Sequence, residues 1–479
     1  MRRHSSRIVY TAKTTFFHHV DFKDTTFMIQ QTKKHDSRSP FAIVAEVRGG
    51  RAPQPSLISP RLAIGLVLVT GLCHTAGAAD LCVNPSGANG CFKTIQAAVT
   101  AASPNDTVNV SAGTYKEAVT IGKPLSLIAS DPTTTTVEVA GLGVGIYVDG
   151  IDNQGLANVI ISGFTIQDAN FEGILVTNAS SVTISGNILM NNDKALKFAG
   201  DSSTCPGIPA FETGEDFDCG EAIHLSGVHH STVLNNTVQN NAGGILLSDD
   251  TAATHDNLIT GNIVSNNSLD CGITLASHPP AAVSGSTTAL GVYQNTVTGN
   301  QSIKNGVIGE GAGVGIFASA PGTAAYSNVV SNNVLTSNGI PGVAIHGHTP
   351  QQNLNNNVII GNTISGNGAD LADTPTSGPT GINVAGISPI TGTIIMQNTF
   401  SQEMLAVVIN APGDARVQRN TFPGGGIGVA NLQGASVNAD SNWWGCTANP
   451  TVGLSGFAGC SLTSGPVTVG SVLSAPLGK

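Results

Sequence analysis

The sequence has few charged and few aromatic residues. Asp, Glu, Lys and Arg make up 10% of its 479 residues and aromatic residues 5%, whereas globular proteins average roughly 25% charged residues. This composition excludes a disordered polyelectrolyte and a coiled coil, because both depend on charged surfaces. It also argues against an ordinary helical enzyme. No Cys-x-x-Cys pair is present, so a zinc or thiol-redox site has little support.

Glycine and apolar residues are plentiful instead. The chain has 58 glycines, and 40% of its residues are hydrophobic. That is enough apolar material for a large core. A chain of this length would ordinarily form about three domains, but repetitive β folds break that rule. Internal repeats therefore have to be sought before domains are counted.

The first 78 residues differ from the rest in composition. They carry 11 of the 20 basic residues and end in the apolar run Leu62–Leu72, which Arg61 precedes and an Ala-Gly-Ala site follows. The run is too short to span a bilayer, and this order is typical of a secretory signal peptide. We therefore expect 61–78 to be a signal peptide and 1–60 to be a mis-annotated N-terminal extension. The mature protein would be secreted and free of the membrane.

The remaining chain is strongly acidic. The whole sequence has a net charge of −10, and most of its basic residues lie before the predicted cleavage site. Only Arg416 and Arg419 remain as arginines. A surface of this charge repels phosphate backbones, so we expect no nucleic-acid partner. It would hold an acidic polysaccharide only through a bridging divalent cation.

The cysteine pattern agrees with export. Three pairs close short loops rich in Gly and Pro, and local disulfides are the simplest interpretation in an oxidising compartment. The predicted bridges are Cys82–Cys91, Cys205–Cys219 and Cys446–Cys460. Cys271 is left over, and we expect it to be a buried free thiol.

One short pattern recurs from about residue 158. Its second half is led by asparagine, as in the segment that starts at Asn187. We expect each leading Asn to occupy a tight turn with positive φ. Stacked copies would hydrogen-bond to one another one coil apart, about 4.8 Å along the axis. Further copies begin at Asn236, Asn262, Asn295, Asn333, Asn362, Asn398, Asn420 and Asn442.

The first half of each repeat is a short Gly-Ile strand, as in Gly173-Ile174-Leu175-Val176. Its alternation has the period of a strand, not of a helix. One such repeat cannot bury its apolar face alone, so the copies must stack into a solenoid. Three short strands per coil predict an all-β parallel β-helix over 79–465, in which Ile174 and Val176 point inward. Residues 466–479 would form a weakly held C-terminal tail.

Both ends of such a solenoid need a cap, because an open end exposes a strand edge. Thr94–Ala102 is the one convincing helix and is followed by a strand over Thr107–Val110. We expect this helix to cap the first coil. Trp443, Trp444 and the loop 446–460 would cover the last coil.

Three segments near the N-terminus of the array carry a resemblance to a known family. Thr94–Val99, Gly113–Glu117 and Pro124–Ile128 resemble the opening of pectin-lyase-like right-handed β-helices, and the later repeats resemble the PbH1-type coils of NosD-like proteins. The resemblance covers roughly residues 81–446. It implies a single-stranded right-handed parallel β-helix. It is less specific for activity, because the fold hosts lyases, hydrolases, esterases, epimerases and non-catalytic proteins.

The catalytic signatures of these relatives are incomplete here. Polygalacturonase-like hydrolases show a paired Asp, a Gly-His-Gly and an Arg-Ile-Lys; this chain has Asp249-Asp250 and a transposed His346-Gly347-His348, but no Arg-Ile-Lys. Lyases use an arginine base, and the two arginines lie late in the array. The resemblance therefore leaves open whether the chain is an enzyme. If it is one, a polysaccharide hydrolase or lyase is implied.

The solenoid offers a second way to find a site, because side chains alternate along a strand. Residues that follow each Gly-Ile would form one outward column, and acidic and imidazole groups gather beside it, as acid–base chemistry requires. The column is Leu175, His224, Leu246, Thr274, Phe317, His346, Asn383 and Gly428, with Glu221 and Asp270 before it and Asp249, Asp250, His278 and His348 beyond it.

We assign roles along this column as follows. Asp249 and Asp250 are the acid and base carboxylates, and Glu221, His224 and His346 flank them. The predicted substrate-binding residues are Thr274, His278, Phe317, His348 and Asn383. The insertion 199–220 is rich in carboxylates that could bind Ca²⁺, namely Glu212, Glu215, Asp216 and Asp218.

The leading hypothesis is a secreted, monomeric β-helix that binds a polysaccharide or cell-surface glycan along one face. Cleavage at that face is the stronger form of this hypothesis. The alternative is a non-catalytic rigid surface or cell-wall protein. That alternative explains the missing arginine motifs directly.

Overall fold

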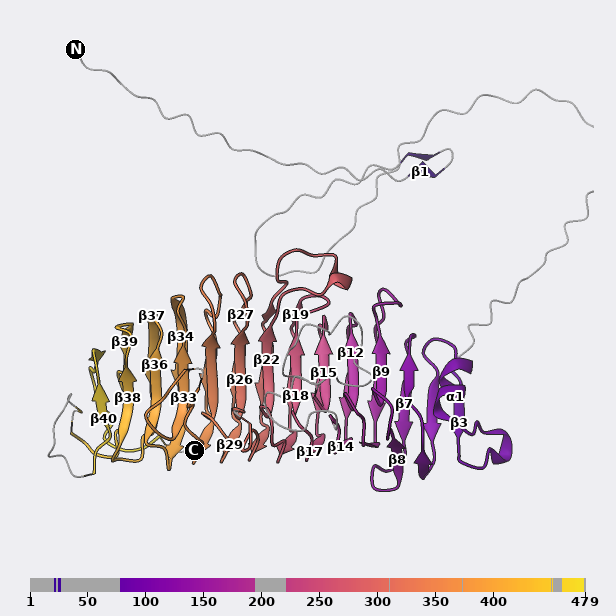
Figure 1. The fold of residues 1–479 in the computed structure, drawn as a ribbon, viewed down its shortest axis with the longest axis horizontal. Helices are drawn as coiled ribbons and strands as arrows, with labels where there is room; N and C mark the ends of the chain where they lie inside the picture. The colour runs from indigo at the N-terminus through magenta and orange to yellow at the C-terminus, as the bar shows by residue number, and fades with distance from the viewer. Residues whose placement is uncertain are drawn as a thin grey trace, which may run out of the picture. The chain divides into compact units, whose positions relative to one another are not determined.

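The structure is a computed structural model. It describes residues 78–193, 221–309, 311–372, 374–448, 450 and 459–477, and two short strands nearer the N-terminus (Figure 1). The chain divides into two units, Met1–Cys73 and His74–Lys479. In the first unit, β1 (Asp21–Phe22) pairs antiparallel with β2 (Thr25–Thr26). The predicted extension and signal peptide otherwise lie outside the described residues.

Three long parallel sheets build the second unit, and they are called sheets 1, 2 and 3 below. Sheet 1 has 14 strands: β3 (Asp80–Val83), β4 (Thr107–Val110), β7 (Ser126–Ala129), β10 (Ile160–Ser162), β13 (Thr183–Ser185), β16 (Thr232–Leu234), β20 (Leu258–Thr260), β24 (Thr296–Thr298), β28 (Val329–Ser331), β31 (Val358–Ile360), β34 (Ile390–Met396), β37 (Gly413–Gln418), β39 (Ser436–Asn438) and β41 (Val467–Thr468).

Sheet 2 has 10 strands: β5 (Gly113–Tyr115), β8 (Thr135–Glu138), β11 (Thr165–Gln167), β14 (Ile188–Met190), β17 (Thr237–Gln239), β21 (Ile263–Ser265), β25 (Gln301–Ile303), β29 (Val334–Thr336), β32 (Thr363–Ser365) and β35 (Thr399–Ser401). Sheet 3 has 12 strands: β6 (Val119–Ile121), β9 (Ile146–Asp149), β12 (Ile174–Thr177), β15 (Ile223–Ser226), β18 (Ile245–Ser248), β22 (Ile273–Ser277), β26 (Val314–Ala318), β30 (Val343–Gly347), β33 (Thr380–Ala385), β36 (Leu405–Asn410), β38 (Ile427–Asn431) and β40 (Leu462–Ser464). A further three-stranded sheet holds β19 (Thr254–His255), β23 (Val292–Tyr293) and β27 (Ala325–Tyr326).

Side-chain alternation explains why these segments stack. On neighbouring strands of sheet 1, Ile161, Ile184 and Val233 pair in register and are buried, whereas the residues beside them face outward. Each coil adds such an inward row to one continuous core. A single coil could not bury these side chains, so the array gains its stability from stacking. The predicted all-β parallel β-helix is confirmed.

Asparagine ladders hold successive coils together, as predicted. Each ladder amide donates to the Oδ1 of the next, at 2.9–3.1 Å along the main ladder. Every Asn also receives a backbone N–H from the coil before it, as in the bond from Asn236 to Asn262. The buried amides are therefore satisfied, which a core position requires. The main ladder is Asn187, Asn236, Asn262, Asn300, Asn333, Asn362, Asn398, Asn420 and Asn442.

Two details of the predicted repeat are wrong. The copy assigned to Asn295 begins at Asn300, because Asn295 belongs to a second ladder with Asn257 and Asn328. The positive φ falls on the residue before each ladder asparagine, for example on Gly261 at 67°. The turn therefore ends one residue earlier than predicted, and the ladder side chain points into the core.

Helix α1 (Ile95–Ala101) covers the first coil. The side chain of Thr94 accepts a hydrogen bond from the Ala97 amide, and Ile95, Ala98 and Val99 are buried. This N-cap satisfies an amide that would otherwise have no partner. Two short 3-10 turns, η1 (Ala88–Gly90) and η3 (Ala282–Ser284), also occur. Across the described residues, no helix has the length and apolar content needed to cross a membrane.

The other end of the array is filled by aromatic rings. Trp444 is fully buried and lies 4.8 Å from Phe422, which in turn stacks 5.5 Å from Phe400, measured between ring centroids. Trp444 therefore closes the core at its last coils, as predicted. Beyond it, the short strand β41 pairs with β39, so the tail adds one more rung to sheet 1.

Two of the three predicted disulfides are present, Cys82–Cys91 and Cys446–Cys460. Cys271 is free and buried, as predicted. Its sulfur accepts a hydrogen bond from the Ala312 amide. The predicted bridge Cys205–Cys219 lies outside the described residues.

Candidate functional site

The outer face of sheet 3 differs from those of the other two sheets. All residues of β12, β15, β18 and β22 are buried, including those that point away from the core. In sheets 1 and 2 the outward residues of most strands are partly exposed. Polar and ionisable side chains on the outer face of sheet 3 therefore sit in a shielded environment, where electrostatic interactions are stronger than in water.

The register corrects the predicted column. His224, Leu246 and Thr274 pair with one another in one outward row, but Phe317 and His346 belong to the neighbouring row, two residues further along their strands. Gly428 faces the core, because a Cβ there would meet the rings of Trp444 and Phe422. Leu175 and Asn383 lie in the row of His224. The predicted residues therefore form two separate groups.

The first group contains a buried hydrogen-bonded chain across three coils. His224 Nδ1 lies 2.6 Å from Glu172 Oε1, and His224 Nε2 lies 2.7 Å from Ser248 Oγ. All three residues are at most 1% exposed. The connectivity is that of a Ser-His-acid triad. Because Ser248 is fully buried in this structure, its hydroxyl is better placed to pass a proton than to attack a polymer.

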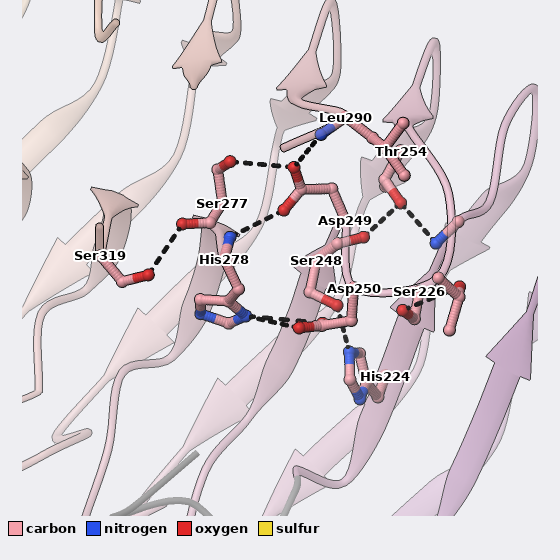
Figure 2. Close-up of polar contacts among 12 residues, drawn as sticks. His224, Ser226, Ser248, Asp249, Asp250, Thr254, Ser277, His278, Leu290 and Ser319 are labelled. Carbon is pink, nitrogen blue, oxygen red and sulfur yellow. Dashed lines mark hydrogen bonds and ion pairs between the residues drawn. The ribbon is translucent and has the colours of Figure 1, made fainter. Parts of the chain in front are cut away.

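Asp250 extends this chain toward the surface (Figure 2). Its Oδ1 lies 3.2 Å from His278 Nδ1, and the side chains of His278 and Asp250 are 16% and 10% exposed. Burial raises the pKa of Asp250, but the charges of His278 and His224 and the hydrogen bonds from His278 and Ser248 outweigh it and lower the pKa to about 2. Asp250 is therefore ionised at neutral pH and linked to Glu172 through Ser248 and His224.

Asp249 points the other way and holds a loop. It accepts hydrogen bonds from the Ser277 hydroxyl and from the amides of His278, Leu290 and Gly291, at 2.5–3.1 Å (Figure 2). Burial raises the pKa of Asp249 against the effect of these donors. Because protein donors occupy both of its oxygens, the geometry favours a structural role over the acid–base role that the sequence suggested.

Glu221 lies beside the same series of hydrogen-bonded side chains. One oxygen each of Glu172 and Glu221 and one nitrogen of His224 lie within 4.8 Å of one another, and all three residues are buried. Glu221 also packs over Gly243, where an added Cβ would lie 2.7 Å from Glu221 Cγ and 3.4 Å from Asp270 Cβ. Two carboxylates and an imidazole are ligands that Zn²⁺ accepts, but His224 and Glu172 already bond to each other.

The second group surrounds His346, and we call it the His346 cluster. The His346 ring lies 4.2 Å from Phe317 and 4.7 Å from His348, measured between centroids, and its Nδ1 lies 3.3 Å from Thr374 Oγ1. The Asn383 amide donates to the same hydroxyl at 3.0 Å. Burial, and then His348, lower the pKa of His346 to about 3, so this imidazole stays neutral.

The two groups do not meet. His224 is on β15 and His346 is on β30, four strands apart, which corresponds to about 19 Å at strand spacing. His346 therefore cannot flank Asp250 as predicted. Thr274 and His278, on and just after β22, lie near the first group. The predicted Ca²⁺ ligands Glu212, Glu215, Asp216 and Asp218 lie outside the described residues.

Two members of the first group were missed from the sequence. Glu172 stands two residues before Ile174, as Glu221 stands two residues before Ile223, so the repeat itself could have identified it. Ser248 had no such signal, because serine and threonine fill the same row at Thr177 and Ser226. Below, "the acidic network" means Glu172, Glu221, His224, Ser248, Asp250 and His278.

The fold and its shielded outer face define the class of protein, a right-handed parallel β-helix. Residues 129–320 match a family model described as "Right handed beta helix region". This agrees with the resemblance to pectin-lyase-like proteins. No curated protein sequence matches the chain.

Solved structures include distant matches to the chain. The catalytic domain of GH87 alpha-1,3-glucanase in complex with tetrasaccharides is 14% identical, with 86% of this chain and 69% of that chain covered and a TM-score of 0.50. The Agl-KA catalytic domain is 12% identical over 79% of this chain, at a TM-score of 0.47, and this chain spans 64% of it. A tailspike protein of E. coli bacteriophage HK620 in complex with pentasaccharide is 12% identical over 73% of this chain and 61% of that chain, at a TM-score of 0.45. At these identities the likeness shows the fold alone.

Proposed function

We propose that the chain binds a polysaccharide along the outer face of sheet 3 and hydrolyses it at the acidic network. The proposal rests on one observation. Ionisable groups from four successive coils are joined by hydrogen bonds, from Glu172 through His224 and Ser248 to Asp250 and His278. Burying such groups costs free energy, and a purely structural coil could use apolar residues in their place.

The environment supports distinct roles for the carboxylates. Asp250 is held ionised at the exposed end of the network and is the candidate general base. Glu221 is as deeply buried as Ser248, so we assign it as the source of the acid proton, which would reach the polymer through the neighbouring, partly exposed Asp270. His224 connects the two ends and can carry a proton between them. Pairs of carboxylates in different environments are how glycoside hydrolases divide acid and base work.

We also propose that the protein works outside the cytoplasm. The two disulfides and the sequence pattern of a signal peptide support this location. A soluble glycan-binding protein would then meet its polymer in the extracellular space. The monomeric state and the lack of nucleic-acid and membrane partners remain predictions.

The test is to screen the purified protein against neutral and acidic polysaccharides, with and without Ca²⁺, for binding and for release of reducing ends. We expect release from at least one polymer, and we expect Asp250→Asn to abolish release while binding is retained. Asp152→Asn is the matched control, because Asp152 is an exposed carboxylate on the loop after β9. Binding without release by the wild type would favour the rigid non-catalytic alternative, and no binding to any polymer would contradict the proposal.

A further inference from the structure

A separate group of imidazoles lies outside sheet 3, three residues beyond the end of β15. His229 Nδ1 and His230 Nδ1 are 2.8 Å apart. His255, one coil further on, stacks on His229 with ring centroids 5.1 Å apart and an interplanar angle of 4°. Neither the acidic network nor the proposed hydrolysis uses these residues.

The rings are held in place by their neighbours. His255 stacks on Tyr293 at 4.9 Å, and Tyr293 stacks on Tyr326 at 5.1 Å, so one column of rings runs through successive coils. The backbone is also fixed, because the His229 amide donates to Ala179 and the His230 amide donates to the His255 carbonyl. Two imidazole nitrogens are therefore brought together before any ligand arrives, which lowers the entropic cost of binding one.

We propose that His229 and His230 form a binding site for a divalent transition-metal ion through their Nδ1 atoms. Metal–nitrogen bonds of about 2.0–2.1 Å at a right angle place two nitrogens about 2.9 Å apart, and the observed separation is 2.8 Å. A tetrahedral ion would require the nitrogens to open to about 3.4 Å. The site therefore suits ions that accept right-angled nitrogen ligands, such as Ni²⁺ and Cu²⁺.

The hydrogen bond between the two rings can give way to such an ion without loss of a proton. One of the two Nδ1 atoms now carries the proton they share, and moving that proton to Nε2 of its own ring frees both lone pairs. No proton needs to leave the protein.

The surroundings supply negative charge. The Asp256 carboxylate lies 2.8 Å from His255 Nδ1. The whole chain has a net charge of −10, which raises the local concentration of cations. Water would complete the coordination sphere, because His230 is exposed. Oxygen-preferring ions such as Ca²⁺ have no comparable ligand set here.

Titration calorimetry of the full chain with nickel(II) chloride tests the proposal. We expect His229→Asn/His230→Asn to weaken binding at least tenfold. His348→Asn removes an exposed imidazole elsewhere and is the matched control. Equal affinity of the wild type and the His229/His230 double variant would overturn the proposal.

Two further measurements keep the test decisive. If the double variant melts early, the single variant His230→Asn replaces it, since His230 is exposed and its loss should leave the fold intact. Electron paramagnetic resonance with Cu²⁺ should show hyperfine splitting from two nitrogens in the wild type and from fewer in His230→Asn. An unchanged nitrogen pattern in that variant would also contradict the site.

Discussion

The acidic network and the His346 cluster occupy the same face of sheet 3, and the central imidazole of each, His224 and His346, is at most 4% exposed. The first keeps ionisable partners in contact, with Glu172 at 2.6 Å from His224 and Asp250 ionised beside His278. The second contains an imidazole that burial keeps neutral, packed between Phe317 and His348. Burial alone therefore does not explain the charges of the network.

The difference separates a chemical role from a packing role. A neutral imidazole that packs against an aromatic ring fills space and stabilises the packing on the outer face of sheet 3. A buried carboxylate–imidazole pair usually gives no more stability than apolar residues of the same volume. We therefore place the chemistry on β12, β15, β18 and β22 and assign the face around β26 and β30 to substrate contact or packing. The following predictions test this separation, from the largest expected effect to the smallest.

The largest effect should come from removing the most deeply buried carboxyl group of the network. Glu172→Leu leaves His224 without its carboxylate, and breaking a buried pair in this way costs about 3–5 kcal/mol of unfolding free energy. His346→Phe keeps a ring of similar size beside Phe317 and should cost about 1 kcal/mol or less. Chemical denaturation of the two variants measures both values. Equal losses would show that the two groups do the same structural work.

Catalysis should depend on the network alone. Asp250→Asn removes the candidate base, and we expect sugar release from the folded variant to fall by about 100-fold or more. His346→Asn should release sugar at close to the wild-type rate. Initial rates of reducing-end release at saturating polymer provide the comparison. An equal loss of sugar release in the two variants would indicate that the two groups form one site.

Asp249 should behave as a structural residue despite its place beside Asp250. In Asp249→Asn, one carboxylate oxygen becomes an NH2 group that cannot accept, so at least the hydrogen bond from the His278 amide is lost, and we expect a loss of about 1–3 kcal/mol. Hydrogen exchange at the His278 amide should speed up. If the variant shows hydrogen exchange at the wild-type rate but no hydrolysis, Asp249 has instead the catalytic role that the sequence suggested.

The pH dependence of stability should distinguish the groups by a smaller amount. The pKa of His346 falls from its ordinary 6.5 to about 3 on folding, so its unfolded form binds a proton first as the pH drops. The contribution of His346 to the free energy of unfolding is intact above pH 6.5 and is lost as the pH falls from 6.5 toward 3. The loss is about 1 kcal/mol near pH 6. Asp250, with its pKa lowered to about 2, contributes above pH 3.8 and is lost only below it.

Denaturation of the wild type and His346→Phe at pH 7.5 and pH 6 measures this difference. The wild type should lose more stability between these two pH values than the variant, because the variant lacks the His346 imidazole. A constant gap between the two proteins would contradict the lowered pKa of His346.

The fold was largely readable from the sequence, because the repeat is local. The Gly-Ile strands, the helix near Thr94 and the asparagine ladder all follow from short patterns that the structure confirms. The errors arise where register matters. Asn295 and Asn300 both lead an Asn-x-Val/Ser-x segment, and only the pairing of coils shows that Asn300 continues the main ladder.

The site was less readable for the same reason. Phe317 and His346 follow a Gly-Ile or an Ala-Ile, yet their strands begin two residues earlier and shift them into the neighbouring row. Asp249 and Asp250 look equivalent in the sequence, but consecutive residues point in opposite directions, so one meets loop amides and the other meets His278. Neither the row nor the direction can be read from composition.

The central claim is that the polymer is bound and cut over the acidic network. A crystal structure of Asp250→Asn soaked with an oligosaccharide from a polymer that the wild type cleaves tests it most directly. The account predicts a sugar chain over β15, β18 and β22, with a glycosidic oxygen within hydrogen-bonding reach of residue 250 or Asp270. A sugar chain bound on sheet 1 or sheet 2, or confined to the His346 cluster, would contradict it.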